Sequence, residues 1–391
     1  KPGRRVNKAV GRRLCSLARQ SLLNADADRT GGDRHSCLIG GRDDAGHDAP
    51  QGIPSPIVDY SKRPDGAEEG HLGRAGYSKS QSSGAERRTT VCVTGAGGFV
   101  GSWLVERLLG CGRYTVHGTV RDPGDAKNAH LGEMDGAAER LRLIKADLLD
   151  YGSMAAAIAG CEGVFHVACP VDVLAPAVTG TENVLKACAE AKVKRVVVVS
   201  SLSAVLVNPD WHKLPVMDES CWSDVEFCRN TENWYSLSKT LAELEAFNYA
   251  KRSGLDVVSV CPSLVIGPLL QPTLNASSSV IVDYLKGERA VKLRLGYFVD
   301  VRDVADALLL VYETPEAFGR YICNSHSRQV SDVIELLKSW YPTYKYADKF
   351  IHVSGGHVFS SKKLETLGWK FKPFEETLRD SVESYIISPV D

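Results

Sequence analysis

The sequence lacks the features that mark several classes of protein. Lys plus Arg (47) nearly equals Asp plus Glu (48), so no net charge is available to hold a nucleic-acid backbone or an anionic membrane surface. The longest apolar runs, such as 196–199 and 308–311, are far shorter than the ~20 residues that span a bilayer. No His or Cys cluster has metal-ligand spacing. We therefore expect no nucleic-acid partner, no membrane insertion and no metal site.

The 11 cysteines include no C-x-x-C pair. Most lie in apolar segments, as Cys92, Cys188 and Cys261 do, which is typical of buried free thiols and of a reducing compartment such as the cytoplasm. Cys221 and Cys228 are seven residues apart and could form a disulfide. Two free thiols are the interpretation that fits a reducing compartment.

Residues 1–88 contain no Phe, Trp or Met and show no helical or strand periodicity. A segment of this composition cannot bury enough apolar surface to fold, so we expect a disordered leader. Its first 23 residues carry seven basic and no acidic side chains, as an organelle-import signal would. Acidic residues from Asp26 onward break that pattern, and the chain opens with Lys1. A non-native extension is the other interpretation, and we expect the protein to be cytoplasmic.

From Thr90 onward, buried strands and amphipathic helices alternate. The expected strands are 91–94, 114–120, 141–146, 163–167 and 195–200, and the clearest expected helices are 99–109, 154–159, 177–191 and 235–251. This order predicts an α/β protein whose doubly wound parallel sheet, a Rossmann fold, is covered by helices on both faces. We divide it into a dinucleotide-binding domain at 89–261 and a smaller substrate-binding region at 262–391.

A glycine-rich turn joins the first strand to the first helix. Gly95, Gly98 and Gly101 follow the spacing G-x-x-G-x-x-G, in which glycine allows a tight turn and a close approach of backbone N–H groups to a pyrophosphate. The helix N-terminus that follows attracts the same anion. A purely structural turn is the alternative, but the strand-turn-helix context favours a dinucleotide site.

The end of the second strand indicates which dinucleotide binds. Arg121, with Lys127 six residues later, suits the 2′-phosphate of NADP(H), whereas a carboxylate there would select NAD. The adjacent Asp122 weakens this inference, and an ordinary solvated turn is the alternative. Asp147 and Leu148, just after the third strand, are placed to line an adenine pocket; for Asp147 a helix N-cap is the alternative.

A Y-x-x-x-K pair opens the helix expected at 235–251. Its spacing puts Tyr235 and Lys239 on one helix face. The ammonium would favour phenolate and make the phenol a usable proton donor beside a nicotinamide ribose. Ser201 ends the fifth strand, at the sheet edge that faces the ligand in such folds. We therefore predict Ser201, Tyr235 and Lys239 as the catalytic residues; an amphipathic surface pair is the alternative for the helix residues.

These motifs resemble those of plant extended short-chain reductases, above all cinnamoyl-CoA reductase-like proteins and the related dihydroflavonol reductases. The resemblance covers residues 89–391 almost continuously, and its most specific segments are 94–101, 200–201, 218–224, 233–239, 260–268, 270–277 and 299–304. It implies NADPH-dependent reduction of an aldehyde or ketone, with Ser201, Tyr235 and Lys239 catalytic. The expected cofactor-binding residues are Gly95, Gly98, Phe99, Gly101, Arg121, Lys127, Asp147, Leu148, Tyr235, Lys239 and Pro262.

The chain departs from that pattern in three places. Residues 236–238 read Ser-Leu-Ser where cinnamoyl-CoA reductases resemble Cys-Tyr-Gly, and Val280 and Asp283 stand where thioester-using members carry an H-x-x-K pair. A negative charge at Asp283 disfavours the phosphates of coenzyme A, so we expect a free carbonyl substrate rather than a thioester. The connection 168–174 is about ten residues shorter than in relatives, which would open the nicotinamide site.

We predict a reductase of aromatic, phenylpropanoid-type carbonyls, because the second region is hydrophobic and contains Leu264, Val265, Leu269 and Leu270. Candidate pocket residues are Leu264, Val265, Leu269, Leu270, His212, Trp222, Tyr297 and Phe298. The alternatives are a nucleotide-sugar epimerase or steroid-type dehydrogenase on the same scaffold, and a catalytically impaired NADP-binding protein. We see no basic cluster after Leu270 for a second diphosphate, which weighs against the epimerase.

Overall fold

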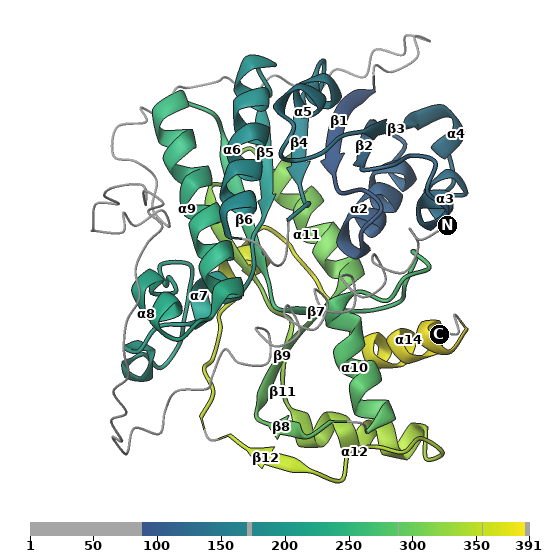
Figure 1. Cartoon of the computed structure of the whole chain (residues 1–391), viewed down its shortest axis with the longest axis vertical. Helices are drawn as coiled ribbons and strands as arrows, with labels where there is room; N and C mark the ends of the chain where they lie inside the picture. Colours follow the sequence, from purple (N-terminus) through teal and green to yellow (C-terminus); the bar gives the residue numbers. More distant parts are fainter. Residues whose placement is uncertain (1–87, 170–173, 288, 354, 388–391) are drawn as a thin grey trace, which may run out of the picture.

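A seven-stranded parallel sheet forms the centre of the molecule (Figure 1). The computed structural model describes residues 88–169, 174–287, 289–353 and 355–387. The strand order is β10-β6-β5-β4-β1-β2-β3. The strands are β1 (Thr89–Thr94), β2 (Tyr114–Val120), β3 (Leu141–Lys145), β4 (Gly163–His166), β5 (Arg195–Val199), β6 (Val257–Pro262) and β10 (Gly319–Cys323). This is the doubly wound α/β fold predicted from the sequence.

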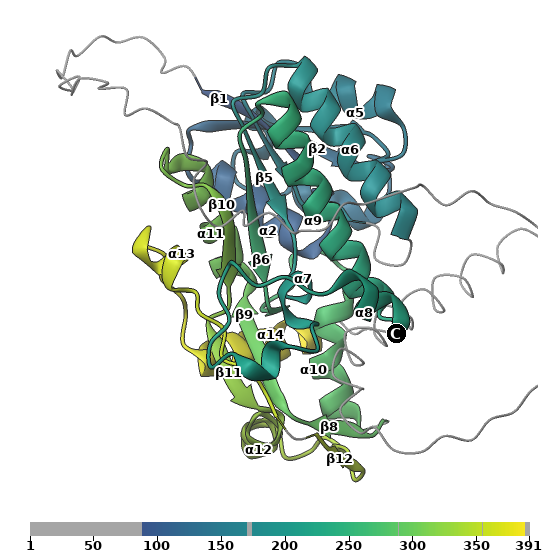
Figure 2. The same ribbon diagram turned by 90° about the vertical axis from the view of Figure 1, so that its left-hand side faces the viewer.

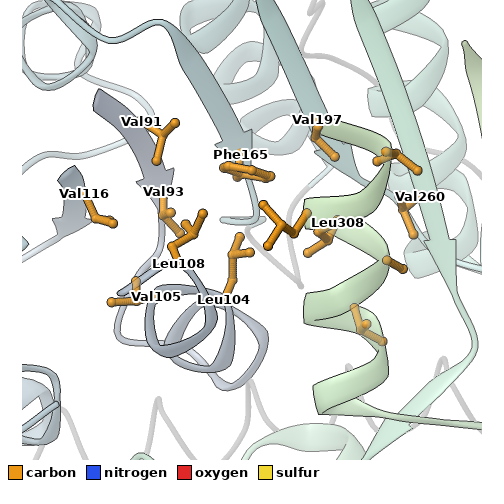
Figure 3. Close-up of a cluster of buried hydrophobic side chains, with 14 of the residues drawn as sticks. Val91, Val93, Leu104, Val105, Leu108, Val116, Phe165, Val197, Val260 and Leu308 are labelled. Carbon is orange, nitrogen blue, oxygen red and sulfur yellow. The ribbon is translucent and has the colours of Figure 1, made fainter. Parts of the chain in front are cut away.

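Alternate residues of the strands face two separate hydrophobic cores, because successive side chains of a strand point to opposite faces of the sheet. On one face, Val91, Val93 and Val197 pack against α2 (Phe99–Gly110) and α11 (Val301–Glu313) (Figure 3). On the other face, side chains of the same strands pack against α5 (Tyr151–Ile158), α6 (Leu174–Glu190) and α9 (Trp234–Ser253). Because both faces of the sheet are buried, the sequences of its strands are almost continuously apolar.

Short elements connect these layers. They are η1 (Ala126–Asn128), α3 (Ala129–Gly132), α4 (Ala137–Arg140), α7 (Ser203–Leu206), η2 (Trp211–Lys213), α8 (Val225–Asn230) and α13 (Lys362–Thr366). Asp224 begins α8 by accepting a hydrogen bond from the Phe227 amide, which is the usual action of an N-cap carboxylate.

A smaller lobe lies beyond the end of the sheet (Figures 1 and 2). Its helices are α10 (Ala276–Lys286), α12 (Val330–Trp340) and α14 (Phe374–Ile387), and its strands are β7 (Leu264–Ile266), β8 (Val291–Leu293), β9 (Leu295–Asp300), β11 (His326–Gln329) and β12 (Phe350–His352). The strands form the sheets β11-β9-β7 and β12-β8. Because β7 follows β6 almost directly, the lobe covers the carboxyl ends of the large sheet, where ligands bind in such folds.

The five expected strands are confirmed, whereas β6 and β10 were not predicted. The boundary at 261/262 stays a prediction, and β10 and α11 lie after it in the sequence although they belong to the large sheet and its covering layer. Among the described residues, no helix is both long and apolar enough to cross a bilayer. The expected leader at 1–88 falls, apart from Arg88, outside the described residues.

Candidate active site

One cavity of about 1140 Å³ lies between the carboxyl ends of the large sheet and the smaller lobe. It is lined by every residue that the sequence predicted for the cofactor or for catalysis: Gly95, Gly98, Phe99, Gly101, Arg121, Lys127, Asp147, Leu148, Ser201, Tyr235, Lys239 and Pro262. We call the lining residues up to Pro262 the cofactor wall and those from Ser263 onward the cap wall.

Two positions of the glycine turn, Gly95 and Gly101, do not suit a larger residue. Gly95 has φ of 69°, a left-handed conformation that favours glycine. A Cβ on Gly101 would lie 2.2 Å from the Gly95 carbonyl oxygen. The N-terminal turn of α2, from Phe99, therefore sits directly on the turn and directs its free N–H groups and positive dipole end into the cavity. This arrangement fits a dinucleotide pyrophosphate.

The end of β2 gives the cavity its positive charge. Arg121 is exposed and lines the cavity, and so does Lys127, which forms an ion pair with Asp125 at 2.8 Å. Asp122, which weakened the prediction of NADP(H), does not line the cavity; its carboxylate accepts a hydrogen bond from the Gly124 amide. A guanidinium without a competing carboxylate at this place fits a 2′-phosphate.

Asp147 is not the N-cap of a helix, which was the alternative role considered for it. The N-cap of α5 is Asp150, whose side chain accepts from the Gly152 amide. Asp147 instead accepts from the Leu149 amide at 2.9 Å and lines the cavity beside Leu148. Both residues thus lie where an adenine-binding role would place them.

Ser201, Tyr235 and Lys239 come together from two elements. Ser201 lies two residues past the end of β5, and its Oγ accepts a hydrogen bond from the Ser203 amide, while its own hydroxyl proton has no acceptor among the described residues. Asn233 begins α9 by accepting from the Ser236 amide, so Tyr235 lies in the first helical turn and Lys239 one turn later. All three side chains line the same cavity.

The environment of Lys239 keeps it charged. Burial lowers the pKa of this lysine, but Cys169, Tyr235 and Glu243 together more than offset that effect, and the net pKa is raised. Its Nζ donates to the Val199 carbonyl at 3.4 Å. A fixed ammonium in this position can act on the Tyr235 phenol, as the sequence predicted.

His166, at the end of β4, is a buried polar residue near Lys239 that we did not single out from the sequence. Its burial, and secondarily the Lys239 ammonium, lower its pKa to about 3, so the imidazole is neutral at physiological pH. Because Thr181 uses its hydroxyl proton for the Ala177 carbonyl, His166 Nε2 donates to Thr181 and Nδ1 accepts from Thr94. This chain fixes the strand ends behind the site.

The cap wall is largely apolar and aromatic. Four of the expected pocket residues line it: Leu264, Val265, Tyr297 and Phe298. Three others do not line it: Leu269, Leu270 and Trp222. The His212 side chain lies outside the described residues. Trp222 is buried and stacks on the guanidinium of Arg320. Two buried oxygens in the wall, Ser263 Oγ and Asn275 Oδ1, have no hydrogen-bond partner among the described residues, so they are positioned to contact a ligand.

Basic side chains also reach the cap wall, which corrects our statement that no basic cluster follows Leu270. Arg289, Lys292 and Arg294 line the cavity together with Val280 and Asp283. Asp283 lies 4.0 Å from Arg289. The positions of these residues in the sequence did not reveal that β8 and the residues beside it face the cavity.

Two other predictions concern thiols and the short connection. Cys221 and Cys228 are both buried free thiols, as are Cys92, Cys188 and Cys261, so the free-thiol interpretation is the one that the structure bears out. In the short connection, residues 170–173 lie outside the described residues. The proposed opening of the nicotinamide site therefore stays a prediction.

The family model of the NAD dependent epimerase/dehydratase family matches residues 91–323. The chain belongs to this family. It is 50% identical over 304 residues to a protein named cinnamoyl-CoA reductase 1 from Petunia hybrida, a match that covers 75% of this chain and 91% of the relative. The resemblance stated from the motifs is thus confirmed.

Two solved structures share the fold. Vestitone reductase from alfalfa superposes with a TM-score of 0.68 at 33% identity, covering 77% of this chain and 99% of that chain. Yeast methylglyoxal/isovaleraldehyde reductase, solved with NADPH, superposes with a TM-score of 0.68 at 26% identity, covering 76% and 98%. These comparisons support the prediction of an NADP-dependent reductase over the prediction of an epimerase.

Proposed function

We propose that this protein uses NADPH to reduce the carbonyl group of an aromatic, phenylpropanoid-type aldehyde or ketone. The observation that carries the proposal is the single cavity in which the glycine turn, Arg121 and the trio Ser201, Tyr235 and Lys239 all meet. A cofactor that spans the cofactor wall from Arg121 to Tyr235 would present its reactive end to the apolar cap wall.

NADPH held by the cofactor wall would supply the hydride that the carbonyl carbon needs. Tyr235 donates its phenolic proton to the carbonyl oxygen as negative charge develops there. Ser201 donates its hydroxyl proton in a hydrogen bond to the same oxygen, which orients the carbonyl and stabilises the charge. Lys239, held as an ammonium, favours the phenolate that Tyr235 becomes. One hydride and one proton convert the carbonyl to an alcohol.

The replacement Tyr235→Phe tests the proton donor. Turnover should fall by at least about 100-fold, the usual contribution of a positioned acid, while the dissociation constant for NADPH stays within about twofold. Tyr284→Phe is the matched control, because Tyr284 lines the same cavity from α10 without a proposed role in proton transfer. Full turnover by Tyr235→Phe would remove Tyr235 as the donor.

A thioester is the second candidate substrate, favoured by the relative's name and by Arg289, Lys292 and Arg294 in the cap wall, which could hold phosphates. Val280 and Asp283 speak against it. NADPH consumption with cinnamaldehydes, phenylacetaldehyde, dihydroflavonols and feruloyl-CoA separates the candidates. Activity on the aldehydes alone supports the first proposal, whereas activity on feruloyl-CoA alone would replace it with the second.

We also propose that the protein works in the cytoplasm, on a small-molecule substrate. The free thiols of the described residues suit a reducing compartment. Fluorescent fusions with and without residues 1–88 test this. Organelle import that depends on 1–88 would contradict it.

A further inference from the structure

A fully buried ion pair lies behind the catalytic trio. Arg320, on β10, donates to Glu243, on α9, through Nε to Oε1 at 2.9 Å and through Nη2 to Oε2 at 3.1 Å. Both side chains have 0% exposure. Neither lines the large cavity, so neither is placed to touch a substrate. Burying such a pair costs roughly as much free energy as the attraction returns, so stability alone is a weak reason for its presence.

The Glu243 carboxylate also holds the strand that leads to Ser201. Ser200 Oγ donates to Glu243 Oε2 at 2.7 Å, and Ser259 Oγ and Cys261 Sγ, on β6, donate to Oε1. Ser200 is the residue immediately before Ser201. A displacement of the carboxylate would therefore be transmitted to the catalytic hydroxyl through one peptide bond.

The same carboxylate acts on Lys239. Glu243 lies one turn after Lys239 on α9, so the two side chains share a helix face. Together with Ser200 they line a void of only about 10 Å³, which has room for about one water molecule. Because Glu243 is fully buried, solvent can screen the interaction only from the side of the large cavity, which Lys239 also lines. Glu243 is among the groups that raise the pKa of Lys239 against the opposing effect of burial.

Arg320 in turn is fixed from several sides. Its Nη1 donates to the carbonyl oxygens of Cys221 at 2.6 Å and Glu219 at 3.3 Å, and its guanidinium lies 3.5 Å from the centre of the Trp222 ring system. A planar guanidinium with these contacts has little freedom to move. It connects the edge strand and the 219–222 loop to the catalytic helix.

We propose that Glu243, clamped by Arg320, is a positioning residue that aligns Ser201 through Ser200 and holds the Lys239 ammonium toward Tyr235. This rests on the proposed function of the trio. The alternative is that the pair only joins β10 to α9.

A charge-free double variant separates these roles. Glu243→Gln or Arg320→Met alone leaves one buried charge unpaired, which destabilises the fold, and Glu243→Gln/Arg320→Met removes both charges. If the pair is a positioning device, the double variant should regain most of the Tm lost by the single variants. Its kcat should remain at least about tenfold low, a part of the 100-fold or more attributed to acid catalysis, with the KM for the carbonyl substrate little changed. Recovery of kcat together with Tm would overturn the proposal.

Ser200→Ala decides the question if the double variant does not fold, because it keeps the ion pair and removes the Ser200–Glu243 hydrogen bond. A kcat lowered by about threefold or more is expected at unchanged NADPH affinity, with a Tm lowered by the loss of one buried hydrogen bond to a carboxylate. An unchanged kcat would overturn the proposal. Glu245→Gln is the matched control, since Glu245 lies on the same helix in an ion pair with the exposed Arg252.

The Tyr235→Phe measurement distinguishes a failure of the positioning role of Glu243 from a failure of the proposed function. An inactive Tyr235→Phe with fully active Glu243 and Ser200 variants removes the positioning role alone. A fully active Tyr235→Phe removes the proton donor on which that role depends.

Discussion

The two walls of the cavity are built in different ways. The cofactor wall comes mainly from strand ends of one parallel sheet and the turns that follow them, as Gly95, Arg121 and Ser201 do, and α9 adds Tyr235 and Lys239. The cap wall is assembled from β7, α10, β8, β9, α12 and β12, which belong to small sheets and separate helices. Parallel strand ends meet at one edge whatever their side chains. The cofactor wall is therefore fixed by backbone topology, whereas the cap wall depends on side-chain identity.

The largest expected effect comes from breaking the cofactor wall at its tightest point. Gly101→Ala places a Cβ 2.2 Å from the Gly95 carbonyl oxygen, and the turn must shift to relieve the clash. Losing about two charge-assisted hydrogen bonds to the pyrophosphate should raise the NADPH dissociation constant by roughly 100-fold, measured by fluorescence titration. Gly110→Ala, at the other end of α2 with open space around its Cβ, is the control. A Gly101→Ala protein that binds NADPH normally would show that the turn does not hold the pyrophosphate.

A smaller effect is expected at the end of β2, where one side chain selects the cofactor. Arg121→Ala should weaken NADPH binding by about 10- to 100-fold, the value of a charged hydrogen-bonded contact, and leave NADH binding almost unchanged. Arg142→Ala removes an exposed arginine on the neighbouring strand β3 that does not line the cavity, and should change neither. Equal losses of NADPH and NADH affinity in Arg121→Ala would contradict the 2′-phosphate assignment.

The sequence was most informative where a local pattern and a fixed topology coincide. The glycine spacing, Arg121 and the Tyr235/Lys239 pair could be assigned because each occurs at a recognisable junction of strand and helix. β10 was missed because Arg320 interrupts its apolar pattern. The partner that makes this arginine tolerable, Glu243, is 77 residues away in the sequence. No pattern within one segment could indicate that these two charges meet in the core.

The cap wall escaped prediction for the same physical reason. In the sequence, Arg289, Lys292 and Arg294 look like an ordinary polar stretch. In the structure β8 pairs with β12, and these three residues line the cavity. Their meaning depends on contacts between segments that the chain order does not specify. Trp222 is the opposite case. We assigned this aromatic residue to the pocket from the sequence, but it stacks on Arg320 of the buried ion pair.

The smallest effect is expected in the cap wall, where changing charge should alter substrate choice without altering the cofactor site. Asp283 is 19% exposed in its side chain, lines the cavity and lies 4.0 Å from Arg289. Asp283→Asn removes only its negative charge, and Asp283→Lys reverses it. Because partly exposed charge contacts are worth about 0.2–1 kcal/mol, kcat/KM for feruloyl-CoA should rise by about two- to fivefold in the first variant and more in the second. Activity on cinnamaldehyde should stay within about twofold. If Asp283→Lys changes kcat/KM equally for feruloyl-CoA and cinnamaldehyde, the cap wall also affects the cofactor site. That result would contradict the idea that the two walls act independently.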